Sequence, residues 1–95
     1  MNYGKNTHYQ NKHGQQLNEF LKATLSPKTL AAWYMLQSLK YNVRAGKKEH
    51  ESEAKDLDKS SDYLEDWAEL TGDEKEFLFE MVQSLKEDFE NWKGE

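Results

Sequence analysis

The stretch that decides the fold is KYNVRAGKK, residues 40–48, where a helical pattern stops at Gly46 and cations gather. Lys40 and Arg44 are four residues apart and would share one face of a helix, and Lys47 follows just past the glycine. Glycine is the usual residue directly after a helix, because it accepts a positive φ at little cost. The stretch therefore predicts the end of a central helix with a basic corner beside it.

The charge of the chain changes sign at this corner. Residues 1–50 hold eight Lys and Arg against two acids, whereas residues 51–95 hold five Lys against sixteen acids. The net charge of −5 disfavours nonspecific binding to nucleic acid. Two interpretations stay open: the basic half holds a phosphorylated small molecule, or the two halves attract each other across the fold.

Length and composition predict one small helical domain, residues 1–95. Twelve aromatic residues favour a packed core although 33% of the residues are charged, and a single proline and five glycines suit helices. The absence of cysteine excludes disulfides and zinc–thiolate sites. No apolar run approaches the roughly 20 residues of a membrane span, and the N-terminus lacks an apolar signal-peptide core. We expect a soluble protein of the cytoplasm.

Apolar spacing predicts an all-α bundle of four helices after an irregular N-terminal arm. The helices are expected over about residues 15–25, 27–45, 51–70 and 73–92. Ser26 is a natural N-cap for the second helix, with Pro27 at its first position. Thr71 and Glu74, three residues apart, suggest a capping box before the fourth helix.

The fourth helix carries an apolar stripe whose partner the sequence leaves open. The stripe follows three- and four-residue steps through Phe77, Leu78, Met81, Val82, Leu85, Phe89 and Trp92. It can pack on the three preceding helices, or it can pair with another subunit. We therefore expect a homo-oligomer.

The basic corner is the leading candidate for a binding site. Lysine and arginine converging within a few residues can neutralise a phosphate, and the start of the third helix would add backbone donors for an anion. Cations at a helix C-terminus also complement its dipole without any ligand. Glu53 and Asp56 share a face of the third helix and are weaker candidates for Mg²⁺. The sequence has no phosphate-binding loop of the GxxxxGK[ST] type.

Three motifs in this order resemble a small bacteriophage family of unknown function that includes a phage nucleotide kinase. The motifs are His-Tyr near the start, the Lys-Tyr…Arg-Ala-Gly-Lys-Lys stretch, and Asp-Leu-x-Lys…Tyr-Leu after it. The resemblance spans residues 8–67 and leaves residues 72–95 as an additional C-terminal helix. The matching positions are His8, Tyr9, Lys40, Tyr41, Arg44, Ala45, Gly46, Lys47, Lys48, Asp56, Leu57, Lys59, Tyr63 and Leu64.

The resemblance implies a phage protein of the host cytoplasm that binds a nucleotide. The implied cations for the phosphate are Lys40, Arg44, Lys47 and Lys48, with Mg²⁺ arriving on the nucleotide. The implied contacts to the base are Tyr9, Tyr41 or Tyr63, with His8 on the base or a phosphate. Asp56 and Lys59 would pair within the bundle and set the geometry of the corner, and Lys59 is also an implied binding residue.

Three functions remain open at this point. The first is a nucleotide-binding protein, either a nucleoside monophosphate kinase or a non-catalytic protein that sequesters a nucleotide signal. The second is a helical pyrophosphatase with Mg²⁺ on its acidic third helix. The third is an interaction protein that binds and inhibits a host protein through its acidic or apolar helical faces.

Overall fold

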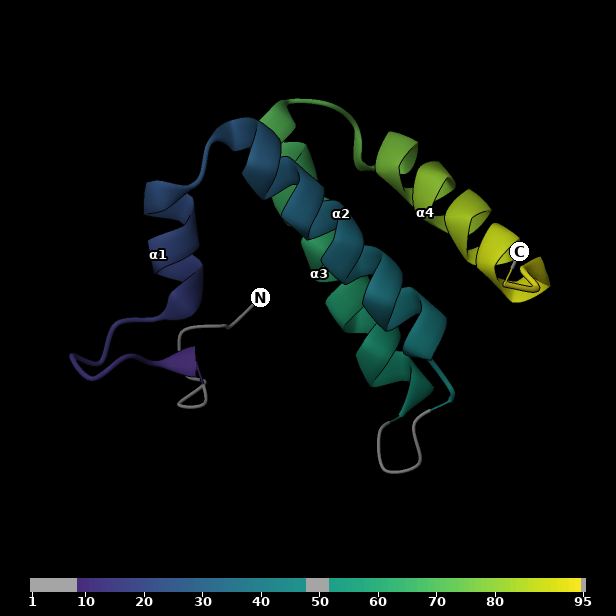
Figure 1. The fold of residues 1–95 in the computed structure, drawn as a ribbon. Coiled ribbons are helices and arrows are strands. Elements are labelled where there is room, and N and C mark those ends of the chain that lie inside the picture. Colours follow the sequence, from purple (N-terminus) through teal and green to yellow (C-terminus); the bar gives the residue numbers. More distant parts are fainter. Residues whose placement is uncertain (1–8, 48–51, 95) are drawn as a thin grey trace.

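Four helices follow the arm, and the prediction of a small all-α bundle is confirmed (Figure 1). The structure, a computed structural model, describes residues 9–47 and 52–94. Before the first helix, residues 9–16 hold an isolated antiparallel bridge between Gln10 and Gln16. The helices are α1 Leu17–Thr24, α2 Pro27–Arg44, α3 Glu53–Thr71 and α4 Lys75–Asn91.

The central helix α2 begins and ends where its sequence predicts. The Ser26 hydroxyl accepts a hydrogen bond from the Thr29 backbone N–H at 3.2 Å, and Pro27 occupies the first turn. At the other end, Ala45 N donates to Tyr41 O and Gly46 follows with a φ of +79°. Both signals are local, so they hold whatever α2 packs against.

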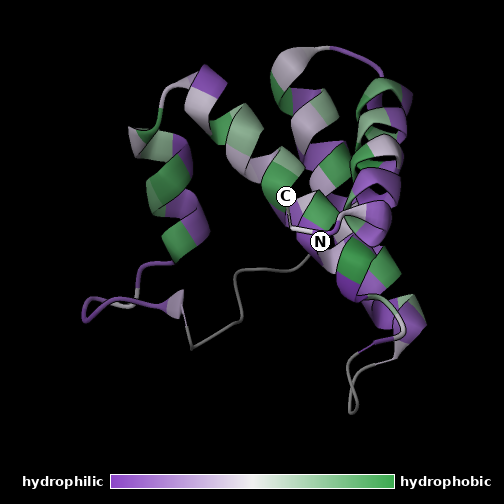
Figure 2. Ribbon diagram, turned by 45° about the vertical axis from the view of Figure 1, so that its right-hand side comes forward, coloured by the Kyte–Doolittle hydropathy of each residue, from purple (hydrophilic) through white to green (hydrophobic). Residues whose placement is uncertain are grey.

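The core lies between α2 and α3, which run antiparallel side by side, with α1 and α4 on opposite flanks (Figures 1 and 2). One buried cluster joins Leu30 and Tyr34 to Tyr63, and the other joins Leu64 to two residues of α4. An edge-to-face contact stabilises the first cluster, with the ring centres of Trp33 and Tyr63 5.5 Å apart. The pair α2–α3 is therefore the frame on which the other two helices rest.

Two serines bring α2 and α3 into close approach. Ser38 and Ser60 are 0% and 2% exposed, and each hydroxyl donates to the other residue's backbone carbonyl, at 3.0 and 2.8 Å. Small side chains allow the two backbones to come near, and the reciprocal bonds satisfy both buried hydroxyls. The Ser60 hydroxyl thus has a structural role in the helix crossing.

The predicted capping box at the start of α4 is wrong. Thr71 is the last residue of α3, and its hydroxyl donates to Trp67 O at 2.9 Å. Gly72 then takes a left-handed conformation with a φ of +80°, which ends α3. The N-cap of α4 is Glu74, and no side chain caps it. The glycine signal for stopping α3 prevails over the Thr–Glu spacing for starting α4.

Only part of the apolar stripe of α4 is buried. Leu78 and Val82 are 1% and 0% exposed, because they face the α2–α3 pair. The remaining residues of the stripe keep between 37% and 65% of their surface exposed, because α4 lies on one flank and none of the helices in the described part of the chain covers its outer side: Phe77, Met81, Leu85, Phe89 and Trp92. We call these five residues the outer stripe of α4.

Asp62 on α3 is the subject of a first stability prediction. Burial raises its pKa, and the charges of Glu65, Asp66 and Asp58 raise it further. A raised pKa means that the folded state binds the proton more tightly, so this group lowers stability as pH rises through the raised value. Asp62→Asn should therefore increase the free energy of unfolding at pH 7 by about 0.5 kcal/mol, because two four-residue repulsions are relieved.

The pH dependence of this gain distinguishes its cause. Near pH 3 the carboxyl is largely protonated in both states, so the advantage of Asp62→Asn should disappear there. Glu19→Gln on α1 removes one charge beside Lys22 and should give no gain at either pH. Chemical denaturation of the three proteins at both pH values measures this, and an equal gain at pH 3 would contradict the electrostatic cause.

Candidate functional site

Three cations surround one aromatic ring where α2 ends. Lys40 Nζ lies 4.7 Å from the centre of the Tyr41 ring, the Arg44 guanidinium carbon 4.8 Å, and Lys59 Nζ 5.2 Å. Beneath them, Tyr41 stacks on Tyr63 with ring centres 5.9 Å apart and planes 8° from parallel. We call these five residues the Tyr41 cluster.

The helix geometry explains how the Tyr41 cluster forms. Lys40 and Arg44 share a face of α2, as their spacing predicts, and Tyr41 lies beside them on the last turns. Lys59 and Tyr63 are also four residues apart, on α3, and the antiparallel packing brings them to the same place. Attraction to the ring stabilises each cation individually, but the three like charges repel one another. A bound anion would relieve that repulsion.

Arg44 has a second role, in an ion pair with a buried carboxylate. Its Nη2 donates to Asp56 Oδ1 at 2.7 Å and its Nε to Oδ2 at 3.4 Å. The Asp56 side chain is 0% exposed, whereas that of Arg44 is 27% exposed. The two-pronged contact uses much of the guanidinium fork, so Lys40 and Lys59 supply the excess positive charge of the Tyr41 cluster.

Other residues of the predicted site lie elsewhere or outside the described ranges. Lys47 Nζ bonds Glu90 Oε1 of α4 at 2.6 Å, and this hydrogen bond lowers the pKa of the Glu90 carboxyl. Tyr9 is 57% exposed in the arm before α1, with no ring or cation contact to the Tyr41 cluster among the described residues. His8 and Lys48 lie outside the described residues.

The start of α3 is less available to an anion than its position suggests. The Ser52 hydroxyl already accepts from the Lys55 backbone N–H at 3.0 Å. Two acids, Glu53 and Asp56, occupy the first turn, where their charges complement the helix dipole. An anion at the corner must therefore be held by the cationic side chains.

The acids of α3 do not converge on one point. Asp56 faces Arg44, while a Glu53 carboxylate oxygen lies 3.1 Å from where a β-carbon on Gly46 would be. Within residues 9–47 and 52–94, no three His, Cys, Asp or Glu side chains gather in a way that could hold a metal ion. The same residues include no helix long and apolar enough to cross a membrane.

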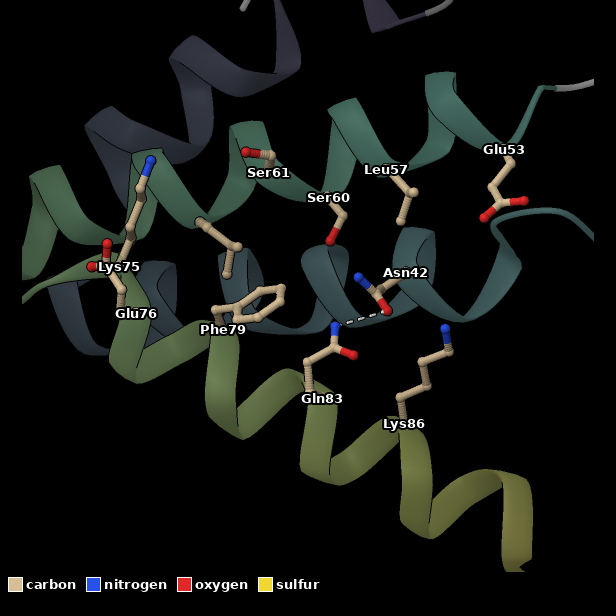
Figure 3. A pocket seen from close by; sticks show the side chains of 11 residues that line it. Asn42, Glu53, Leu57, Ser60, Ser61, Lys75, Glu76, Phe79, Gln83 and Lys86 are labelled. Atoms are coloured by element: carbon tan, nitrogen blue, oxygen red, sulfur yellow. Dashed lines mark hydrogen bonds between the residues drawn. The ribbon is translucent and has the colours of Figure 1, made fainter.

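A groove of about 590 Å³ lies between α3 and α4 (Figure 3). Asn42 of α2 forms part of its wall and accepts a hydrogen bond from Gln83 Nε2 of α4 at 3.1 Å. Figure 3 shows the side chains of Phe79, Gln83 and Lys86 rising from α4 toward α3. The remaining lining residues are Glu53, Leu57, Ser60, Ser61, Leu64, Lys75 and Glu76.

Sequence reasoning missed this groove for an identifiable reason. Asn42 lies within residues 40–48, and a polar residue at a buried helical position is a usable signal. Its partner Gln83 is 41 residues away, on a helix whose rotation the apolar stripe alone leaves ambiguous. Nothing local in the sequence pairs the two amides.

Comparison with known proteins identifies relatives among phages. Residues 4–65 match the family model described as "Protein of unknown function (DUF3310)". The chain is 45% identical over 101 residues to the "SaV protein" of Lactococcus phage p2 and 43% identical to that of Lactococcus phage SK1. In both cases the alignment covers 100% of this chain and 79% of the relative. No solved structure matches the chain significantly.

Proposed function

The chain belongs to the DUF3310 family of small phage proteins of unknown function, and on that premise we propose that it binds the phosphate of a nucleotide at the Tyr41 cluster. The observation that carries the proposal is the approach of three cations to within about 5 Å of one ring, with Asp56 paired to only one of them. Lys40 is exposed and Lys59 half-buried, so both ammonium groups can reach a ligand.

The chemistry of the Tyr41 cluster favours phosphate over a carboxylate. Two lysines on separate helices can contact different oxygens of one phosphate or neighbouring phosphates of a chain. Lysine acts as a compact charge rather than a planar fork, so it imposes little geometry of its own. A di- or triphosphate, with its higher charge, should therefore bind more tightly than a monophosphate.

Two versions of this function differ in turnover. In the first, the protein is a nucleotide kinase, and its lysines neutralise charge during phosphoryl transfer while Mg²⁺ bound to the nucleotide supplies the rest. In the second, the same residues hold a nucleotide without reaction and remove it from solution. Product formation from a nucleoside monophosphate and ATP, followed by chromatography, separates the two versions.

The proposal predicts a large loss of affinity when the two lysines are removed together. Lys40→Ala with Lys59→Ala should weaken binding of the preferred nucleotide by about a hundredfold, roughly tenfold for each charged contact. A thermal-shift screen of mono-, di-, tri- and cyclic nucleotides, with and without Mg²⁺, identifies the ligand, because a bound ligand raises the Tm. Calorimetric titration then gives the affinities.

Two exposed lysines provide a matched control. Lys22→Ala with Lys28→Ala removes the same charge from α1 and the first turn of α2, away from the Tyr41 cluster. This control should bind with little change at physiological salt. The proposal fails if no nucleotide raises the Tm, or if both double variants lose affinity equally, which would indicate only a diffuse attraction of net charge.

A second candidate function rests on the outer stripe of α4. Five large apolar side chains on one side of a helix are unusual on a surface exposed to water. The chain could bind a host protein through this surface, or assemble with further copies of itself. This candidate does not compete with the first for residues, because the outer stripe and the Tyr41 cluster share none.

A further inference from the structure

The groove between α3 and α4 carries chemistry that the Tyr41 cluster does not use. Its two walls are rows of side chains at one-turn spacing, Glu53, Leu57 and Ser61 on α3 facing Phe79, Gln83 and Lys86 on α4 (Figure 3). Its volume of about 590 Å³ lies within the usual range for pockets that hold small molecules. The groove is thus large enough for a ligand with one or two rings.

The pair of amides inside the groove is only half satisfied. Asn42 is 5% exposed, and the one hydrogen bond of its side chain within the described ranges is with Gln83. With the amides oriented as found, Asn42 Nδ2 keeps its donors and Gln83 Oε1 remains an acceptor. Reversing both amides exchanges the two roles and leaves the same outcome, one donor and one acceptor side by side. A buried amide donor that has lost its water without gaining a partner is unfavourable, and a ligand could recover that cost.

The other lining groups describe the rest of the ligand. Phe79, 46% exposed, lies at one end of the groove, and Leu57, 40% exposed, lies on the α3 wall next to Glu53 (Figure 3), so apolar surface flanks the amide pair on both sides. At the opposite end Lys86 and Glu53 approach from the two walls (Figure 3). Lys86 has no ion pair among the described residues, and the Glu53 carboxylate can accept hydrogen bonds from hydroxyl groups.

We propose that this groove is a second binding site, for a nucleoside-type molecule: a flat nitrogen heterocycle with a hydroxylated substituent. The ring lies against Phe79, and the substituent passes Leu57. Its edge, which offers an acceptor next to a donor, meets the donor and acceptor of the Asn42–Gln83 pair. The hydroxylated part points to Glu53 and Lys86. Because no phosphate is required, this site does not rest on the function proposed for the Tyr41 cluster.

The test uses the full chain and phosphate-free ligands. The four common ribonucleosides, and the free bases as a second arm, are titrated to millimolar concentration while the side-chain NH₂ signals of Asn42 and Gln83 are followed by NMR. We expect one nucleoside to shift both signals in a saturable way, with the free base binding more weakly because it lacks the hydroxyls. If neither amide signal moves with any nucleoside or base, the proposal is overturned.

Paired variants on α4 separate binding from folding. Phe79 lines the groove and Phe77 does not, although both side chains are exposed, at 46% and 62%. Phe79→Ala should weaken the nucleoside about tenfold through lost ring contact, and Phe77→Ala should leave the affinity unchanged. Gln83→Leu, which keeps the volume but not the polar atoms, should abolish saturable shifts of Asn42. Equal effects at Phe77 and Phe79 would overturn the assignment to the groove.

The two binding-site proposals can be contradicted independently of each other. Lys40→Ala with Lys59→Ala should leave nucleoside binding intact, and Gln83→Leu should leave binding of inorganic tripolyphosphate intact. If Lys40→Ala with Lys59→Ala abolishes nucleoside binding while Gln83→Leu has no effect, the nucleoside binds at the Tyr41 cluster and the groove proposal is wrong.

Discussion

Arg44→Ala is expected to lower the free energy of unfolding by about 3–5 kcal/mol, because it removes a charged partner from a fully buried carboxylate. The free energy of unfolding of a domain of this size is typically about 5–15 kcal/mol. The loss is therefore a large share of the total stability, and a noticeable fraction of Arg44→Ala should be unfolded at physiological temperature. Denaturation with urea, followed by circular dichroism at 222 nm, measures the change.

A double variant tests whether the loss of stability comes from the buried Asp56 carboxylate that has lost Arg44. Replacing both partners with apolar residues, as Arg44→Met with Asp56→Leu, should cost less than Arg44→Ala alone, since no buried carboxylate that has lost its arginine remains in the interior. If the double variant is less stable than Arg44→Ala by the full cost of a second substitution, the two residues act independently. The ion pair would then contribute little to stability.

This role changes which residue reports on ligand binding. Arg44 has the side chain best suited to a phosphate, and its substitution is the obvious first experiment. However, a loss of binding in Arg44→Ala would be indistinguishable from partial unfolding of the end of α2. Lys40 and Lys59 have no ion pair among the described residues, so their removal is the clean measurement.

The sequence predicts what is decided locally and misses what depends on how helices meet. Ser26, Pro27 and Gly46 determine the ends of α2 through contacts within a few residues, and the structure matches them. The shared face of Lys40 and Arg44 follows from helical geometry alone. That Lys59 also reaches Tyr41 depends on the register between α2 and α3, which the Ser38–Ser60 crossing sets. No spacing rule along the chain contains that register.

Burial was the harder quantity to predict on α4. The apolar stripe from Phe77 to Trp92 is wide enough for neighbours on two sides, but the chain provides a neighbour on one side only. Periodicity shows that a residue is apolar and on a given face, and it does not show whether that face is covered. For the same reason, the outer stripe of α4 remains the best physical argument for a partner.

Leu78→Ala is expected to lower the free energy of unfolding by about 3 kcal/mol, because Leu78 is 1% exposed and packs with Val82 and Leu64. The measurement is a chemical denaturation curve with probes on both halves of the fold. The matched family model ends at residue 65, so the result also reports whether α4 belongs to the same cooperative unit. A single transition that moves as a whole indicates one unit, and a separate early transition indicates that α4 melts alone.

Phe77→Ala on the same turn is the control, and it also tests the outer stripe of α4. Phe77 is 62% exposed, so in a monomer its removal should change the free energy of unfolding by no more than about 0.5 kcal/mol. If copies of the chain cover the stripe, Phe77→Ala should instead lower the Tm by an amount that depends on protein concentration, since assembly stabilises the folded state by mass action. A Leu78→Ala loss as small as that of Phe77→Ala would mean that α4 does not dock on the α2–α3 pair. The apolar contact between Leu78 and Leu64 would then not hold α4 in place.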